Sequence, residues 1–230
     1  MRKFTLTALC GGLLTVFCSP LQAASLNIKV VGSDAAPLPS AVVSVVGAEV
    51  AASQAAAVES APAVEIDQRG KRFVSHVTVV APGREVNFPN SDDIRHSVYS
   101  FSGDNSFELK LYRANDAPPV SFAHQGIVKL GCNIHDNMKA YVVVSNNPTV
   151  QVTDDNGNAR LDHSTLVAGV DLEFWHPQLE QPLIYRVSDA LLASAEGLEI
   201  MLPVIWEDPQ APRSLNKLEQ MLKSYAEQGK

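Results

Sequence analysis

The stretch Gly131–Met138, which reads GCNIHDNM, places a cysteine, a histidine and a methionine at a C-x2-H-x2-M spacing. Apolar runs typical of β-strands flank it on both sides, GIVKLG over residues 126–131 and AYVVV over residues 140–144. The spacing therefore predicts that the three side chains lie on one short loop between two strands. A second histidine, His96, stands upstream at the start of another such run, HSVYSF.

The sequence allows several roles for the cysteine of this stretch. The sequence contains three cysteines, but Cys10 and Cys18 lie in a segment that we expect to be removed, which leaves Cys132 alone. A single thiol in an oxidising compartment is a buried inert group, half of an intermolecular disulfide, or a ligand. Its position among two histidines and a methionine, in a chain rich in β patterns, favours the ligand.

The four side chains together match one known ligand set. A thiolate, two imidazoles and a thioether are the ligands of a blue (type 1) copper site, in which the methionine forms a long axial bond. Soft sulfur favours Cu(I) and imidazole suits both oxidation states, so the mixed set holds either state with little rearrangement. We therefore predict one type 1 copper ion with the ligands His96, Cys132, His135 and Met138.

The N-terminus has the three parts of a secretory signal: basic residues 2–3, an apolar stretch over residues 4–17, and small residues up to Ala23. We expect residues 1–23 to be a cleaved signal peptide and the mature chain to be a periplasmic protein. No apolar run is long enough for a membrane-spanning helix, so no membrane anchor is expected. Loss of the two basic residues changes the formal net charge of −7 to −9.

Composition excludes several classes of protein. A chain of 230 residues with 46% hydrophobic residues is too apolar to be disordered and long enough for one large or two modest domains. A pI near 5.3 argues against a nucleic-acid partner. Residues 64–146 hold nine basic and nine acidic residues, whereas residues 147–230 hold six and thirteen, so the acidity lies outside the block with the predicted ligands.

Short β patterns separated by turn residues run through most of the chain, which indicates an all-β fold of antiparallel sandwiches. Asn156-Gly157 is predicted as a hairpin turn between the strands TVQVTD and NARLDH. Apolar residues at helical spacing over residues 213–228, with Ser214 as the N-cap, predict an amphipathic C-terminal helix.

The block over residues 64–146 resembles the cupredoxin family, and in particular amicyanin and plastocyanin-like proteins often labelled methylamine utilisation proteins. GREVNFPN at residues 83–90 with the following HSV, and GIVKLGC at residues 126–132, carry the resemblance. It implies a Greek-key β-sandwich that binds copper. It also implies that Asn90 holds the ligand loops together by hydrogen bonds and that the Ser97 backbone N–H reaches the cysteine sulfur. Ser97 departs from plastocyanin, which has asparagine at this position.

The same resemblance implies a route for electrons. In the family, the ring edge of the later histidine reaches the surface through an apolar patch, and here that histidine is His135. The predicted members of this patch are His135, Ile134, Pro89, Pro118 and Pro119.

The flanks of this block resemble a transthyretin-type, carboxypeptidase regulatory-like sandwich, through APLPSAVVSV in residues 36–45 and through residues 152–161 and 170–175. We therefore predict one sandwich interrupted by an inserted cupredoxin. The expected segments are a signal peptide (1–23), the first sandwich strands (24–46), an Ala-rich linker (47–63), the copper domain (64–146), the remaining sandwich (147–206) and a C-terminal tail (207–230).

Three functions are compatible with these residues. The first is an electron carrier, not an enzyme, that cycles between Cu(I) and Cu(II) and exchanges single electrons with a periplasmic dehydrogenase or c-type cytochrome. The second is a copper-handling protein without an electron-transfer role, although Met-rich tracts are absent from the sequence. The third is a Cys–His thiol enzyme, which the short Cys132–His135 spacing and the nearby Met138 disfavour.

Overall fold

The computed structural model describes residues 25–47, 62–162, 166–193 and 197–210. Regular structure within these ranges is almost entirely β-strand, and the prediction of an all-β fold is confirmed. The predicted signal peptide, most of the Ala-rich stretch and the predicted helix over residues 213–228 lie outside the described residues. Among the helices of the described ranges, none has the length and apolar character needed to cross a membrane.

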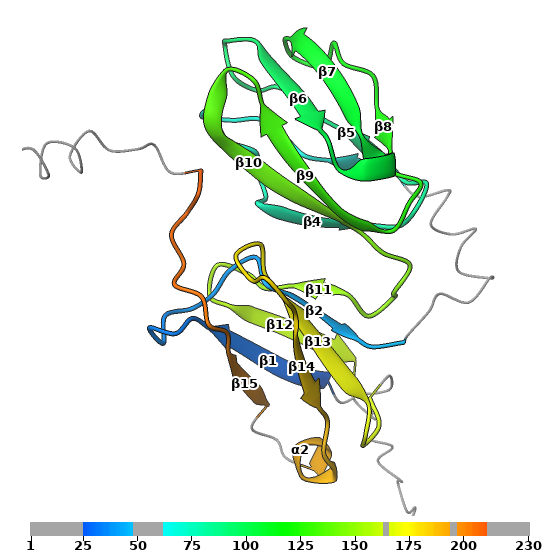
Figure 1. Cartoon of the computed structure of the whole chain (residues 1–230), viewed down its shortest axis with the longest axis vertical. Coiled ribbons are helices and arrows are strands. Elements are labelled where there is room, and N and C mark those ends of the chain that lie inside the picture. The colour runs from blue at the N-terminus through cyan, green and yellow to red at the C-terminus, as the bar shows by residue number, and fades with distance from the viewer. Residues whose placement is uncertain (1–24, 48–61, 163–165, 194–196, 211–230) are drawn as a thin grey trace, which may run out of the picture.

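Residues 62–146 form a β-sandwich, which we call the central unit (Figure 1). One sheet has the strand order β4-β10-β9-β6-β7 and the other β3-β5-β8. The strands are β3 (Val64–Glu65), β4 (Val77–Val80), β5 (Glu85–Asn87), β6 (His96–Ser100), β7 (Phe107–Tyr112), β8 (Val120–Ser121), β9 (Gly126–Cys132) and β10 (His135–Val144). A short 3-10 turn, η1 (Gly103–Asn105), joins β6 to β7. β10 pairs parallel with β4 and antiparallel with β9, which is consistent with the expected Greek-key sandwich.

The core of the central unit follows from the two-residue period of its strands. On β10 the buried side chains alternate with more exposed ones, and Ala140, Val142 and Val144 point inward. They pack against aromatic and aliphatic side chains of the second sheet and its connections, among them Phe88 and Phe122. Cys132 and Met138 belong to the same buried cluster, so the predicted ligands lie at one end of a packed core.

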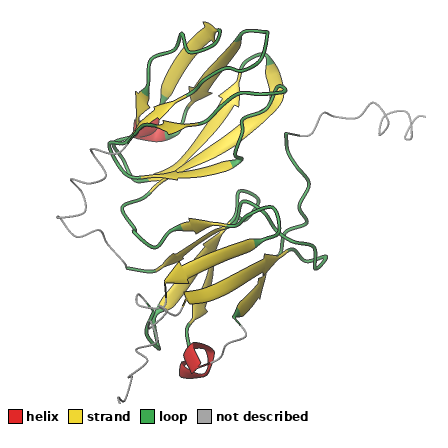
Figure 2. Cartoon of the chain, turned by 180° about the vertical axis from the view of Figure 1, so that it is seen from behind, coloured by secondary structure: helices red, strands yellow, loops and turns green. Residues whose placement is uncertain are grey.

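The segments on either side of the central unit share a second sandwich, the flanking unit (Figure 2). Its sheets are β12-β1-β15 and β11-β2-β13-β14. The strands are β1 (Ser25–Val31), β2 (Val42–Val45), β11 (Gln151–Val152), β12 (Asn158–Asp162), β13 (Asp171–Trp175), β14 (Leu183–Arg186) and β15 (Leu198–Met201), with the short helix α2 (Asp189–Ala193). β2 and β11 pair antiparallel, so the chain leaves and re-enters this sandwich on neighbouring strands.

The predicted turn at Asn156-Gly157 is present, but the strands that it joins do not pair with each other beyond it. β11 pairs with β2 and β12 pairs with β1, so the turn carries the chain from one sheet of the flanking unit to the other. Two backbone hydrogen bonds close the turn, from the Gly157 N–H to the Asp154 carbonyl oxygen and from the Asp154 N–H to the Asn158 carbonyl oxygen. The Asp154 carboxylate also accepts the N–H groups of Asn156 and Asn158. Gly157 has a φ of +74°, and a side chain there would collide with the Val30 carbonyl oxygen. Close packing against β1 therefore explains the glycine.

Candidate metal centre

His96 is the first residue of β6 and is fully buried. A regular strand would turn alternate residues to opposite faces, but the register between β6 and β7 shifts between His96 and Val98. This irregularity lets His96, Ser97 and Val98 all be buried, as a β-bulge does when it re-aims a side chain. Both His96 and Ser97 therefore face the end of β9.

Cys132 ends β9 and is 4% exposed. Its Sγ lies 3.8 Å from the Nδ1 of His96 and 3.8 Å from the Ser97 hydroxyl. The resemblance implied a contact through the Ser97 backbone N–H, whereas the contact in the structure is made by the hydroxyl. That hydroxyl also accepts the N–H of Asn133 at 3.0 Å, which ties the residue after Cys132 to β6.

His135 and Met138 lie in the first part of β10, not on a loop. Only residues 133 and 134 separate the two strands, and His135 pairs directly with Cys132. The pairing then jumps, so that Lys139 opposes Gly131 and residues 136–138 bulge out of the register. The prediction of one short ligand loop is therefore corrected to an irregular hairpin, whose bulge lets Met138 point into the core with 1% exposure.

The ligand atoms of His96, Cys132 and His135 all lie within 4.8 Å of one another. The rings of His96 and His135 have centroids 5.0 Å apart and an interplanar angle of 58°. Of the described His, Cys, Asp and Glu residues, these three form the one such cluster. The structure thus brings together three of the four predicted ligands, and Met138 is buried in the same core while its role as the axial ligand stays a prediction.

The Nδ1 of His135 is buried and has no hydrogen-bond partner among the described residues. Such an atom carries a desolvation cost unless something binds it. Burial lowers the pKa of His135, as do the neighbouring His96 ring and the charge of Lys71, against a smaller opposing effect of Asp92. The imidazole is therefore neutral at pH 7 and has a lone pair to offer. One thiol and two imidazoles with an unpartnered nitrogen fit a copper ion.

Asp92 is a site residue that the sequence reasoning missed. Its Oδ2 accepts the Nε2–H of His96 at 2.8 Å, which leaves the Nδ1 lone pair of that ring directed at Cys132. The carboxylate also accepts the backbone N–H groups of Gly70 at 2.6 Å and Lys71 at 2.8 Å. Burial works to raise the pKa of Asp92, but these N–H groups and the imidazole together lower it, so the carboxylate is charged.

Asn90 is buried beside this network. Its Nδ2 donates to the carbonyl oxygens of Ile94 at 2.9 Å and Tyr112 at 3.1 Å, and its Oδ1 accepts the N–H of Asp92. These bonds fix the loop before β6 to the end of β7. They hold the loop that carries Asp92 and leads to His96, whereas no recorded bond of Asn90 reaches the hairpin with Cys132.

The residues predicted to form the electron-exit patch differ in their exposure. Ile134 is 48% exposed and precedes the half-buried His135, so an apolar side chain does stand at the surface next to this histidine. Pro89 is half-buried, and Pro118 and Pro119 are exposed. Membership of these prolines in the patch stays a prediction.

No protein-family model and no curated protein sequence matches the chain. A Cu-containing nitrite reductase from Thermus scotoductus has a similar structure over 36% of this chain and 22% of its own, with 22% identity and a TM-score of 0.35. A reduced Cu(I) form of an amicyanin mutant is similar over 45% of this chain and 98% of its own, with 17% identity and a TM-score of 0.34. A purple cupredoxin from Nitrosopumilus maritimus is similar over 36% and 99%, with 18% identity and a TM-score of 0.33. The chain thus spans about a fifth of the nitrite reductase.

Proposed function

We propose that this chain is an exported type 1 copper protein that carries single electrons between redox partners, and not an enzyme. The observation that supports it most is the cluster of His96, Cys132 and His135, whose ligand atoms lie within 4.8 Å of one another. In this proposal one copper ion would be held by the thiolate of Cys132 and the Nδ1 atoms of both histidines, with Met138 as the fourth ligand.

The chain's own residues perform three tasks at such a site. Asp92 orients the His96 ring by accepting its Nε2–H, so that the Nδ1 lone pair faces the metal position. The burial of His96, Cys132 and Met138 excludes water from this side of the site. The Ser97 hydroxyl lies close enough to the thiolate to donate to it. A bound copper ion supplies a centre that alternates between Cu(I) and Cu(II).

Two features support exchange of electrons at the surface. His135 is the least buried of the three clustered residues, and the exposed Ile134 beside it offers an apolar contact to a partner. The partner we propose is a c-type cytochrome or a dehydrogenase of the periplasm. Because residues 64–146 carry balanced charge, we expect docking to depend more on this apolar contact than on long-range steering.

Addition of Cu(II) to the purified protein tests the site. We expect intense visible absorption from thiolate-to-copper charge transfer, which Cys132→Ser abolishes and His135→Ala strongly alters. A colourless wild-type protein, or colour retained in Cys132→Ser, contradicts the assignment. His124→Ala changes an exposed histidine outside the cluster and serves as the matched control.

A second measurement separates electron transfer from copper handling. We expect ascorbate to bleach the copper-loaded protein and a periplasmic cytochrome c to restore the colour over repeated cycles. A protein that instead passes its copper to a chelator or apo-protein faster than it exchanges electrons is a copper-handling protein. Cell fractionation and N-terminal sequencing of the mature chain test the proposed export and cleavage after residue 23.

A further inference from the structure

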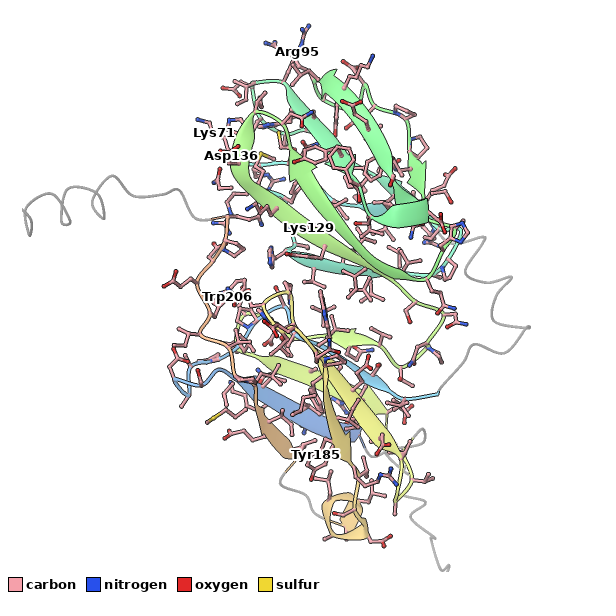
Figure 3. The ribbon with its side chains drawn as sticks, viewed as in Figure 1. Lys71, Arg95, Lys129, Asp136, Tyr185 and Trp206 are labelled. Atoms are coloured by element: carbon pink, nitrogen blue, oxygen red, sulfur yellow. The ribbon has the colours of Figure 1, made fainter. Side chains whose placement is uncertain are left out.

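Residues 206–210, which we call the strap, follow the last strand of the flanking unit and reach the central unit. They follow β15 and Val204, whose side chain is buried in the core of the flanking unit and whose carbonyl oxygen accepts the N–H of Ser33. The orange segment of Figure 1 runs from β15 up to the central unit, and Trp206 is labelled along it in Figure 3. The strap therefore begins in one unit and ends on the other.

The strap is bound to the central unit by polar contacts, and those of Gln210 are buried. Gln210 is 2% exposed, and its side-chain amide makes two hydrogen bonds to the backbone of Phe73. Its Oε1 accepts the Phe73 N–H at 2.7 Å and its Nε2 donates to the Phe73 carbonyl oxygen at 3.0 Å. Next to this pair, Arg72 donates to Asp208 at 2.5 Å. The turn that carries Arg72 and Phe73 is thus fixed to the strap.

This turn is the one that holds Asp92. The N–H groups of Gly70 and Lys71 donate to the Asp92 carboxylate, and the same carboxylate accepts the Nε2–H of His96. Hydrogen bonds therefore connect the strap to a predicted copper ligand through a single short turn and a single carboxylate.

A second connection reaches the other side of the site. The Nδ2 of Asn137 donates to the carbonyl oxygen of Gln210 at 3.1 Å. Asn137 lies between His135 and Met138 in the bulge of β10, where the strand pairing that would otherwise hold the backbone is interrupted. The strap thus contacts both segments that carry the predicted ligands, one through the turn at residues 70–73 and one through Asn137.

We propose that Gln210 is a positioning residue of the metal centre, and that the flanking unit fixes the ligand geometry through the strap. This inference rests on the proposed copper function only where the experiments measure copper-loaded protein. Gln210 contacts no ligand atom; it acts by fixing the Phe73 turn, and through its carbonyl oxygen it fixes Asn137. When this anchor is lost, we expect both ligand segments to open locally while the two cores remain folded.

The first experiment measures the metal-free protein. We compare the alkylation rate of Cys132, followed by mass spectrometry of its peptide, in the wild type, Gln210→Ala and Gln210→Met. Methionine keeps the length and apolar volume of the side chain but forms no amide hydrogen bonds, so it keeps the test valid if alanine impairs folding. We expect roughly tenfold faster alkylation in both variants, the effect of losing about one net hydrogen bond. Gln181→Ala, an exposed glutamine of the flanking unit, should leave the rate unchanged.

Amide hydrogen exchange separates positioning from general destabilisation. Val142 reports on the core of the central unit and Leu172 on that of the flanking unit, because both are fully buried. We expect their exchange to change much less than the alkylation of Cys132. An alkylation rate equal to that of the wild type, or one that rises only in step with exchange at these two amides, overturns the proposal.

The second experiment uses the copper-loaded protein. We expect Gln210→Ala to shift the charge-transfer band and the reduction potential, and to release copper to a chelator roughly tenfold faster than the wild type. Spectrum, potential and release rate all equal to the wild type would overturn the positioning role. If the wild type binds no copper, the proposed function fails, and the alkylation experiment still decides whether Gln210 positions the cluster.

Discussion

Asp92 connects the predicted ligand His96 to the turn at Gly70 and Lys71, and three groups donate to its carboxylate. Nothing in the local sequence separates it from Asp93, the next residue, which is exposed. The two carboxylates differ only in where the loop before β6 directs them. Their contrast provides a direct test of how much this contact contributes.

Asp92→Asn is expected to lower the free energy of unfolding of the metal-free protein by about 1–3 kcal/mol. The amide replaces one acceptor oxygen by an NH2 group, so at least one of the three donors loses its partner. In the copper-loaded protein the loss of a negative charge beside the imidazole should raise the reduction potential. Urea unfolding and redox titration measure the two effects.

Asp93→Asn is the matched control, because it removes the same charge from the exposed neighbour. Its stability should stay within about 0.5 kcal/mol of the wild type. Equal effects of the two substitutions would show that net charge, and not the contact with His96, decides the result.

Ser97→Ala tests the hydroxyl beside the cysteine. The substitution leaves the Asn133 N–H without its acceptor and removes the group that lies 3.8 Å from the Cys132 sulfur. We expect a loss of about 1 kcal/mol in stability and a lower reduction potential, because the thiolate loses a donor. Ser121→Ala, at an exposed serine of β8 whose hydroxyl donates only to the Gly83 carbonyl oxygen, should leave the reduction potential unchanged. An unchanged potential in Ser97→Ala would mean that the hydroxyl does not act on the sulfur.

The sequence predicts the clustered side chains better than it predicts the residues that hydrogen-bond to them. Residue type is enough to select His96, Cys132 and His135, because thiolate and imidazole define the chemistry of the site wherever the backbone brings them together. The hydrogen-bond partners of these side chains depend on the paths of loops and the positions of bulges, and residue types alone do not reveal either. Asp92 was therefore missed, and the Ser97 contact was assigned to the backbone instead of the hydroxyl.

The hairpin of β9 and β10 shows the same limit for whole elements. Alternation of apolar residues predicts both strands. The sequence does not show why a glycine, Gly131, precedes Cys132. In the structure Gly131 pairs with Tyr99 of β6 and leaves room for the tyrosine ring. A Cβ atom at residue 131 would lie 2.7 Å from the Cζ of Tyr99, which is closer than real contacts allow.

Gly131→Ala is expected to cost about 1 kcal/mol, because the end of the half-buried Tyr99 side chain must move away from the strand. Tyr99→Ala removes the ring and should make the alanine at residue 131 nearly neutral. A double-mutant cycle of unfolding free energies measures this coupling. Additive effects of the two substitutions would contradict the explanation by collision.

Turns were harder to predict than strands. Asn156-Gly157 has the composition of a hairpin turn, yet it joins strands of different sheets. Local turn chemistry selects a reversal of the chain but does not choose the sheet that the next strand joins, because that choice depends on the packing of the whole sandwich. Strand positions follow from local pattern, whereas strand partners do not.

Across the whole molecule, aromatic and histidine side chains fill the contact between the two units. The ring of Trp206 lies 5.5 Å from that of His76 in the central unit and 5.4 Å from that of His176 in the flanking unit. Tyr141 and Trp175 make a further contact at 5.9 Å. The local sequence around His76 and His176 gives no sign that two distant segments meet there.

This contact predicts an effect of pH. His176 is fully buried, its Nδ1 accepts the Gln178 N–H, and burial together with the charge of His76 lowers its pKa to about 4. The unfolded chain has an ordinary histidine pKa near 6.5 and binds the proton first as the pH falls. The free energy of unfolding should therefore decrease between about pH 6.5 and pH 4, by up to ~3 kcal/mol from this residue.

Urea unfolding of the metal-free protein at about pH 7 and about pH 4.5 measures this decrease. His176→Gln should lose much less stability over the interval than the wild type, since glutamine does not titrate. His124→Gln changes an exposed histidine and should retain the full dependence. An equal loss in His176→Gln and the wild type would assign the effect to other groups.

The position of the central unit between β2 and β11 has a consequence for the order in which the chain folds. Every strand of the central unit pairs within that unit, whereas β1 and β2 pair with strands that are made much later. The hydrogen bond between Ala41 and Thr153, for example, joins residues 112 positions apart. Such distant pairs become far less costly once the intervening chain is compact. The strands that are synthesised first are therefore expected to find their partners last, after the central unit has folded and brought the two ends of the flanking unit together.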